Sequence, residues 1–149
     1  MKFVPFVLAV ALASNASAEV VSRFEVPIAS AIINSCNGEV VAVSGASQTI
    51  VRSTETRSGN YIFGLHFDVG ALRGVGESTG ADYRVIDVYN ASFQLGLGET
   101  FSSQEAFRMI GQGPKAPSFI VNYRIHFTIT PNGNFVVYVD DLVARCTGK

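Results

Sequence analysis

Residues 119–130 constrain the fold more than any other stretch, because apolar and polar side chains alternate there with a period of two. The intervening residues are mostly polar, and one face carries an unbroken apolar row of Phe119, Val121, Tyr123, Ile125, Phe127 and Ile129. Alternation of this kind, rich in β-branched and aromatic residues, is typical of a strand buried on one face. A helix would scatter the same residues around its circumference. The pattern therefore predicts a β-strand.

The residues that follow predict how this strand is paired. Pro131 presets φ for a turn and Gly133 accepts a left-handed conformation, so we expect a tight turn at 131–133 and a second strand over 134–144. This loop sets a register that joins apolar to apolar residues and cation to anion. A shift by one residue would expose the apolar row to water. The predicted pairs are Phe127 with Val137, Ile125 with Val139, Arg124 with Asp140, and His126 with Tyr138.

Residues 1–18 have the pattern of a secretory signal peptide. Lys2 supplies a positive charge, residues 3–12 are apolar, and Ala16-Ser17-Ala18 forms a small-x-small cleavage site before Glu19. The apolar stretch is too short for a membrane-spanning helix, which needs about 20 residues. We therefore expect a secreted or periplasmic protein whose mature chain, residues 19–149, folds as a single β domain.

The charge pattern excludes some classes of partner. The formal net charge is −1, and the chain has neither a basic run nor an acidic tail. A nucleic-acid-binding surface needs clustered Lys and Arg, and so does a patch that binds anionic lipid headgroups. We therefore expect no nucleic-acid partner and no membrane span.

The two cysteines of the chain are Cys36 and Cys146. Two cysteines in an exported chain most often form a disulfide. A reactive thiol is the alternative, but it would need an activating neighbour, and Arg145 is the one basic residue adjacent to either cysteine. We predict a Cys36–Cys146 disulfide that fastens the last strand to the beginning of the fold.

Further strand patterns separated by turn signals occur throughout the mature chain. Residues 19–35 are ambiguous, with a first strand possible over 20–28 and either a short helix or more strand over 29–33. Gly64 suggests a bulge or tight bend. Residues 70–80 are predicted to form a loop or a narrow strand, and they lack the signature of a phosphate loop. The remaining predicted strands are residues 39–43, 48–57, 61–69, 101–110, and one long strand over 82–95 whose apolar row is interrupted by Asp87.

These elements predict an all-β fold. Sequential strands with short links usually pair with their neighbours, so we expect an antiparallel meander of about eight strands. A closed barrel is favoured because long strands in an open sheet would leave extended free edges. A β-sandwich is the alternative.

Three short motifs carry a resemblance. They are Asn34-Ser35-Cys36-Asn37-Gly38-Glu39, then Ile110-Gly111-Gln112-Gly113-Pro114, and the ending Thr128-x-x-Pro-Asn-Gly with Val139-Asp140-Asp141 and Cys146. The chain resembles a group of small exported bacterial all-β proteins of unassigned function. The resemblance implies the fold and export, and it adds no catalytic residues.

The candidates for chemistry are His66 and His126, each on the more polar face of a predicted strand, with Asp68 near His66. A metal site would need both histidines and Asp68 to adjoin, and a catalytic dyad would need a nucleophile and an orienting acid. The alternative is that both histidines are exposed strand residues, with His126 packed on Tyr138. No established catalytic motif is present, so we predict no cofactor and no metal.

The other functional feature is aromatic. The candidate lining of a ligand cavity is Tyr61, Phe63, Phe67, Tyr83, Tyr123 and Phe127. The interior of a small barrel is either filled by such side chains or holds one small apolar pocket. The leading hypothesis is a secreted binding module for a small apolar or amphipathic ligand. The alternatives are a cyclase or hydrolase that uses His66 or His126, and a structural or surface-interaction protein without a pocket.

Overall fold

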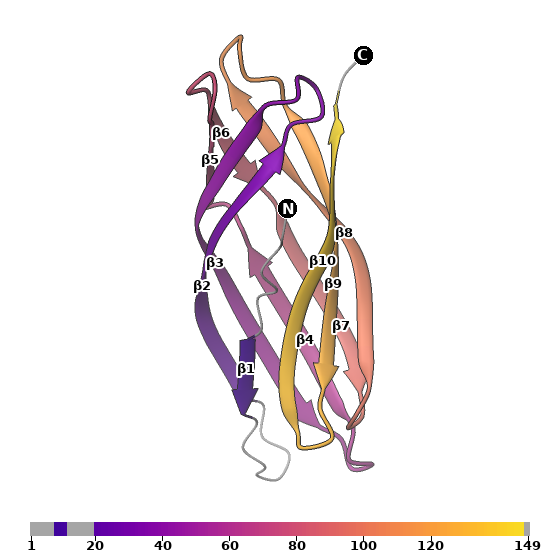
Figure 1. The fold of residues 1–149 in the computed structure, drawn as a ribbon. Coiled ribbons are helices and arrows are strands. Elements are labelled where there is room, and N and C mark those ends of the chain that lie inside the picture. Colours follow the sequence, from indigo (N-terminus) through magenta and orange to yellow (C-terminus); the bar gives the residue numbers. More distant parts are fainter. Residues whose placement is uncertain (1–7, 12–19, 148–149) are drawn as a thin grey trace.

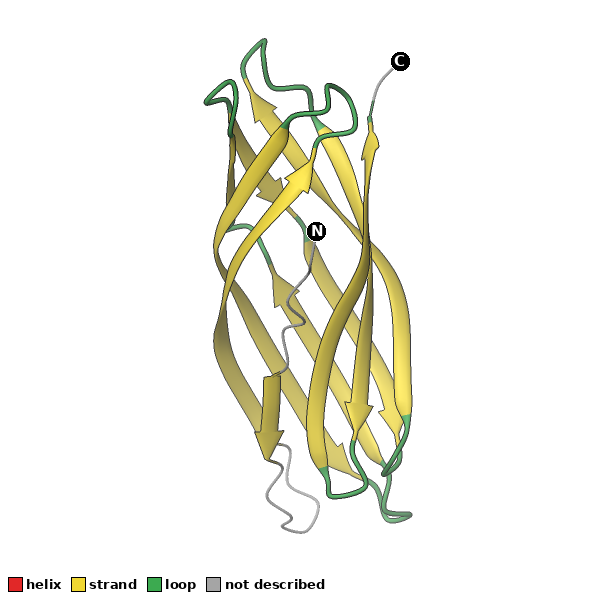
Figure 2. Cartoon of the chain, viewed as in Figure 1, coloured by secondary structure: helices red, strands yellow, loops and turns green. Residues whose placement is uncertain are grey.

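The computed structural model describes residues 8–11 and 20–147, and every regular element in them is a β-strand (Figure 1, Figure 2). The predicted all-β class is therefore confirmed. The cleavage site expected at 16–18 lies outside the described residues. The strands are β1 (Leu8–Ala11), β2 (Val20–Ile33), β3 (Val40–Glu55), β4 (Tyr61–Asp68), β5 (Arg73–Gly76), β6 (Asp82–Ile86), β7 (Val88–Leu95), β8 (Thr100–Gln112), β9 (Phe119–Ile129) and β10 (Asn134–Cys146).

All of these strands belong to one antiparallel sheet of ten strands. The long strand β3 pairs with β4 over its second half and with β5 over its first half, so β4 and β5 lie along one line. β7 pairs with β4 and β6 pairs with β5, so these two also share a line. The single strand predicted over 82–95 is therefore divided at Asp87 into β6 and β7, which pair with different neighbours. Because of the breaks at 69–72 and at Asp87, two positions in the sheet are each shared by two short strands. Ten strands therefore occupy the eight strand positions of a simple meander.

The closed barrel predicted from the sequence is not supported, because the sheet does not close. Within the part of the chain that the structure describes, β2 pairs with β3 alone and β1 with β10 alone, and no pairing joins these two edges. The β2 edge carries Pro27, which has no N–H to donate, and the exposed charges of Arg23 and Glu25. Such residues disfavour pairing at a sheet edge. Figure 1 shows that the open sheet still curls strongly around its inner face.

The inner face of the curled sheet holds two apolar clusters. The first lies toward the disulfide and includes Tyr83, Met109, Phe119 and Val121. The second lies toward the turn at residues 131–133 and includes Phe63, Phe93, Ile125, Phe127 and Phe135. Both clusters are in contact with Phe67, Phe107 and Leu142.

The β9–β10 hairpin confirms the predicted register, including the Phe127–Val137 and His126–Tyr138 pairs. Gly133 has φ +79° and donates its N–H to the Thr130 carbonyl oxygen at 2.9 Å, which closes the turn. The inward residues Tyr123, Ile125 and Phe127 are 5%, 2% and 0% exposed. The outward residues between them are half-buried.

One ion pair of this hairpin differs from expectation. Arg124 does lie opposite Asp140, but its Nη1 contacts Asp141 Oδ2 at 3.0 Å. A bulge between Asp140 and Val143 inserts extra residues, and Asp141 has φ +52° there. The bulge redirects the neighbouring carboxylate toward the guanidinium, which simple alternation could not indicate.

The expectation for Gly64 is wrong, whereas Gly74 agrees with the predicted narrow strand. Gly64 does not form a bulge, since the registers of β4 with β3 and with β7 run through it without a shift. Gly74 lies within β5, in the stretch predicted as a loop or narrow strand. A Cβ on Gly74 would lie 2.7 Å from Met109 Cε and 2.8 Å from Val41 Cγ1, so close packing requires glycine. The segments 39–43 and 48–57 merge into β3, with Gly45 at φ +138° between them.

A disulfide joins Cys36, in the turn after β2, to Cys146 at the end of β10. The predicted pairing is confirmed. The bond therefore ties the two open edges of the sheet together at one end. No helix in the described ranges is long and apolar enough to cross a membrane.

Candidate functional site

β7 and β8 are consecutive strands that separate from each other. β6 pairs with β8 as far as Ile86 and Arg108, and the same register continued along β7 would place Phe93 opposite Phe101. These two rings do stack, with centroids 4.6 Å apart. Among the described residues, however, β7 has backbone pairing with β4 alone. The region between residues 88–95 and 100–107, where the two backbones do not pair and side chains alone meet, is named the slot below.

Polar side chains gather on the inner side of the slot. The Ser103 hydroxyl donates a hydrogen bond to Glu105 Oε1, and the Tyr89 side chain is hydrogen-bonded with Ser103. Tyr123, on β9, is influenced electrostatically by Asp87, Glu105 and Tyr89. The polar layer is the name used below for Asp87, Tyr89, Ser103, Glu105 and Tyr123. They lie beside Phe107, whose ring centroid is 5.9 Å from that of Tyr123.

The electrostatics of the polar layer are unfavourable to the fold. Burial raises the pKa of Asp87, and the carboxylates of Glu105 and Asp68 raise it further. Burial is also the main cause of the raised pKa values of Tyr89 and Tyr123. Among the salt bridges of the described residues, none involves Asp87 or Glu105. Negative charge therefore accumulates near Tyr123 and the half-buried ring of Phe107, which packs on it.

Asp87→Asn is expected to raise the melting temperature at pH 7. Because the pKa of Asp87 is raised in the folded state, the folded protein binds this proton more tightly than the unfolded chain. Stability contributed by this group therefore grows as the pH falls through the raised pKa toward the ordinary value, and it is lost at higher pH. The asparagine variant should lack that contribution to the pH dependence.

Thermal melts of Asp87→Asn and the native protein between pH 7 and about pH 4 test this expectation. Asp82→Asn, at an exposed position of β6, is the matched control. A lower melting temperature of Asp87→Asn at pH 7 would show that the carboxylate stabilises the fold instead.

The aromatic residues predicted to line a cavity are distributed over both apolar clusters. Tyr83 lies in the first cluster, whereas Phe63, Tyr123 and Phe127 lie in the second. Phe63, Tyr83 and Phe127 are fully buried, and Tyr61 and Phe67 are half-buried. Two surface hollows of the described residues are lined by none of these six. The six side chains pack the core at these positions, and ligand binding by them stays a prediction.

Sequence reasoning missed three members of the polar layer, Asp87, Ser103 and Glu105, as site residues. A signal was present, since Asp87 interrupts an apolar row and Ser103 and Glu105 alternate with Phe101 and Phe107. The alternation could not show that the β8 row from Phe101 to Phe107 faces inward and yet remains accessible. Its accessibility depends on the separation of β7 from β8.

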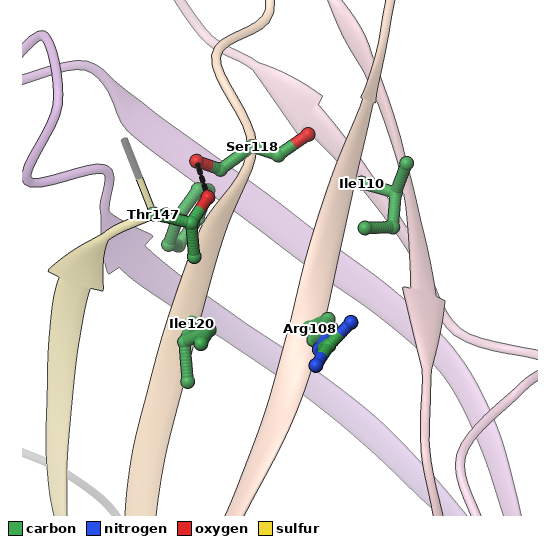
Figure 3. Close-up of a pocket in the computed structure, with 6 residues that line it drawn as sticks. Arg108, Ile110, Ser118, Ile120 and Thr147 are labelled. Atoms are coloured by element: carbon green, nitrogen blue, oxygen red, sulfur yellow. Dashed lines mark hydrogen bonds between the residues drawn. The ribbon is translucent and has the colours of Figure 1, made fainter. Parts of the chain in front are cut away.

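The two hollows lie elsewhere. One, of about 280 Å³, is lined by Arg108, Ile110, Ser118, Phe119, Ile120 and Thr147, and the Thr147 hydroxyl donates to the Ser118 carbonyl oxygen at 2.7 Å (Figure 3). The other, of about 630 Å³, lies over Gly64, His66 and Asn90. Gly64 has no side chain to fill this second hollow.

The two candidate histidines are not brought together. His66 lies on β4 and His126 on β9, and these strands are not neighbours in the sheet. His66 Nδ1 is 2.8 Å from Asn90 Oδ1, while Asp68 Oδ1 instead accepts the Gly70 N–H at 2.7 Å. Within residues 8–11 and 20–147, no group of three or more His, Cys, Asp or Glu side chains could hold a metal. A shared His66–His126–Asp68 metal site is therefore not formed.

His126 has the more elaborate surroundings. Its Nδ1 is 2.6 Å from Ser102 Oγ and its Nε2 is 3.1 Å from Asp140 Oδ1. The ring packs on Tyr138 with centroids 5.8 Å apart, as predicted. The arrangement follows from register, since Ser102 pairs with His126 and His126 pairs with Tyr138. Sequence reasoning missed Ser102 because the β8–β9 pairing was not specified.

The residues around Cys36 make hydrogen bonds that hold neighbouring turns together. Asn34 is fully buried, and its Nδ2 donates to the Tyr83 hydroxyl at 3.1 Å and to the Pro117 carbonyl oxygen at 2.9 Å. Glu39 Oε1 accepts hydrogen bonds from the Thr79 hydroxyl and N–H and from Ser78. The Thr79 hydrogen bond is the main cause of the lowered pKa of Glu39. These contacts fasten the turns at the disulfide end.

No family model, no curated protein and no solved structure matches the chain. The resemblance to small exported bacterial all-β proteins therefore stays a prediction.

Proposed function

We propose that the protein is an exported binding module that takes a small amphipathic ligand through the slot between β7 and β8. The observation that carries this proposal is the inner row of β8 from Phe101 to Phe107, which is half-buried, whereas the inner row of the neighbouring strand β9 is fully buried. This row offers aromatic rings and carboxylates side by side. Ligand sites in proteins typically combine an apolar lining with a few polar groups that fix orientation.

The apolar part of the ligand would pack on Phe101 and Phe107. Phe101 stacks on Phe93 and lies 6.3 Å, between centroids, from Phe127, so it borders the second apolar cluster. Phe107 is in contact with both clusters. An alkyl or aromatic group placed here would remove these half-exposed rings from water, at about 25 cal/mol per Å² of apolar area buried.

The polar end of the ligand would face Asp87 and Glu105. Because the neighbours that raise the pKa of Asp87 include two further carboxylates, an anionic headgroup would be repelled. A cationic or neutral headgroup is therefore favoured. The raised pKa values of Tyr89 and Tyr123 keep both phenols protonated at neutral pH, so their hydroxyls could donate to a ligand.

Export is part of this proposal. A disulfide between Cys36 and Cys146 is compatible with an extracellular or periplasmic protein, where disulfides persist. The pattern of residues 1–18 supports the same compartment.

The proposal is tested with three amphiphiles of one chain length, decyltrimethylammonium, decyl maltoside and decyl sulfate, each below its micelle-forming concentration. The first two should bind saturably and raise the melting temperature, since a ligand that binds the folded state stabilises it. Glu105→Gln should weaken binding of the cation about tenfold, which corresponds to about 1.4 kcal/mol.

Glu77→Gln, at an exposed turn position, is the matched control and should bind like the native protein. Absence of saturable binding, or an equal effect of the two glutamine variants, would contradict a ligand site in the slot. The surface-interaction alternative would then be the better account.

The surroundings of His126 favour a second candidate function, acyl transfer. Ser102 would attack a carbonyl carbon while His126 accepts the hydroxyl proton and Asp140 orients the ring, and His126 would return the proton to the leaving group. Ser102 is exposed, so an ester could reach it. The distances of 2.6 Å and 3.1 Å suit these roles.

If this candidate is correct, Ser102 should be labelled by a fluorophosphonate, and p-nitrophenyl acetate should be hydrolysed. Ser102→Ala and His126→Asn should each abolish both reactions, while Ser58→Ala, in an exposed turn, should leave them unchanged. Labelling no faster than that of the Ser102→Ala variant would assign the three residues to cross-strand hydrogen bonding alone.

A further inference from the structure

The start of β10 lacks the protection that β2 and the second half of β10 carry. Free edges of natural sheets carry charges, prolines or bulges that prevent pairing with another chain. β2 has Pro27, and the second half of β10 has the bulge between Asp140 and Val143. The first residues of β10, Asn134–Val137, contain no charged residue and no proline, and their pairing with β9 has no bulge where its register is defined.

The structure shows one strand that pairs with this segment. β1 pairs with it antiparallel, with Leu8 opposite Val137 and Ala11 opposite Asn134. Figure 1 shows β1 beside the lower part of β10, at the end of the molecule away from the disulfide. An extended stretch of small apolar residues, Leu-Ala-Val-Ala, therefore fits the edge.

We propose that the mature protein binds an extended apolar peptide by strand addition to residues 134–137 of β10. This inference depends on the expected removal of residues 1–18, which would take β1 away and leave the edge unpaired. It does not depend on the slot, because β8 and β10 lie on opposite sides of β9. Main-chain hydrogen bonds would supply affinity, and alternate side chains would supply selectivity.

The register defines the peptide. Phe135 is 1% exposed and belongs to the second apolar cluster, and Val137 packs against it. Peptide residues opposite Phe135 and Val137 would extend the inner face and must be apolar. The residue opposite Val136 would lie on the outer face. We therefore expect a partner with apolar residues at alternate positions and no proline between them.

The test uses a synthetic peptide of residues 6–12, with solubilising lysines at its ends, and the chain of residues 19–149. The peptide should bind and slow amide hydrogen exchange in residues 134–137. Two further peptides of the same sequence carry N-methylated amides at alternate positions, one at the odd and the other at the even positions. At least one of them should fail to bind, because strand pairing needs the N–H groups of the peptide. The full chain of residues 1–149 should bind the peptide at least tenfold more weakly, since its own segment occupies the edge.

Exchange that is unchanged at 134–137, or equal binding of the parent and both methylated peptides, would overturn the proposal. Protection at 134–137 that grows with protein concentration without peptide would overturn it in favour of pairing between two copies. Amphiphile binding that is lost in Glu105→Gln but retained with peptide bound would show that slot and edge are separate.

Discussion

Phe127→Ala is expected to lower the free energy of unfolding by about 3–5 kcal/mol, as for other large aromatic side chains removed from a core. Phe127 is fully buried, and its ring centroid is 5.0 Å from that of Phe93 and 6.0 Å from that of Phe135. Truncation would remove apolar burial and leave a cavity that the surrounding strands cannot close. Urea-induced unfolding gives the free energy directly.

Thr128→Ala is the matched control on the neighbouring residue of β9. Its hydroxyl lies 2.8 Å from the Thr100 hydroxyl on the outer face, where water can replace the hydrogen bond. The expected cost is below about 1 kcal/mol. If the threonine variant were the more damaging one, the inner and outer faces assigned to β9 would be reversed.

Cys146→Ser is expected to lower the free energy of unfolding by about 2–5 kcal/mol. The disulfide closes a loop with a sequence separation of 110 residues, so reduction gives the unfolded chain much more conformational freedom. In the folded state, the bond also holds the end of β10 against the turn that contains Asn34 and Glu39.

Cys36→Ser breaks the same bond and should cost nearly the same free energy, which separates loss of the disulfide from loss of either side chain. Thermal and urea melts of both variants provide the comparison. Two reactive thiols in the native protein, or melting temperatures close to that of the native protein, would contradict a disulfide in solution.

The proposed function and the stability of the fold act against each other in the polar layer. Asp87 is placed where burial and neighbouring carboxylates disfavour its charge. Groups that cost stability in this way are commonly found at functional sites. A single outcome links the two ideas, since Asp87→Asn should stabilise the protein and weaken binding of the cationic amphiphile.

The sequence by itself determined the local structure of the most regular elements. The alternation in residues 119–130 identified the buried face of β9, and Pro131 with Gly133 determined the register of the β9–β10 hairpin. This worked because strand periodicity and turn chemistry act over a few adjacent residues. The disulfide could be predicted for a different reason, since two cysteines in an exported chain have one possible pairing.

Only the tertiary structure decided that the sheet remains open and that β7 and β8 separate. Both features depend on whether distant strand edges come close enough to pair, and the alternation within each strand is the same in either case. The position of Glu105 relative to Tyr123, and of Ser102 relative to His126, follows from pairing across strands that no single stretch encodes. A period of two assigns each residue to a face, but the neighbour it meets there depends on the free energy of the whole sheet.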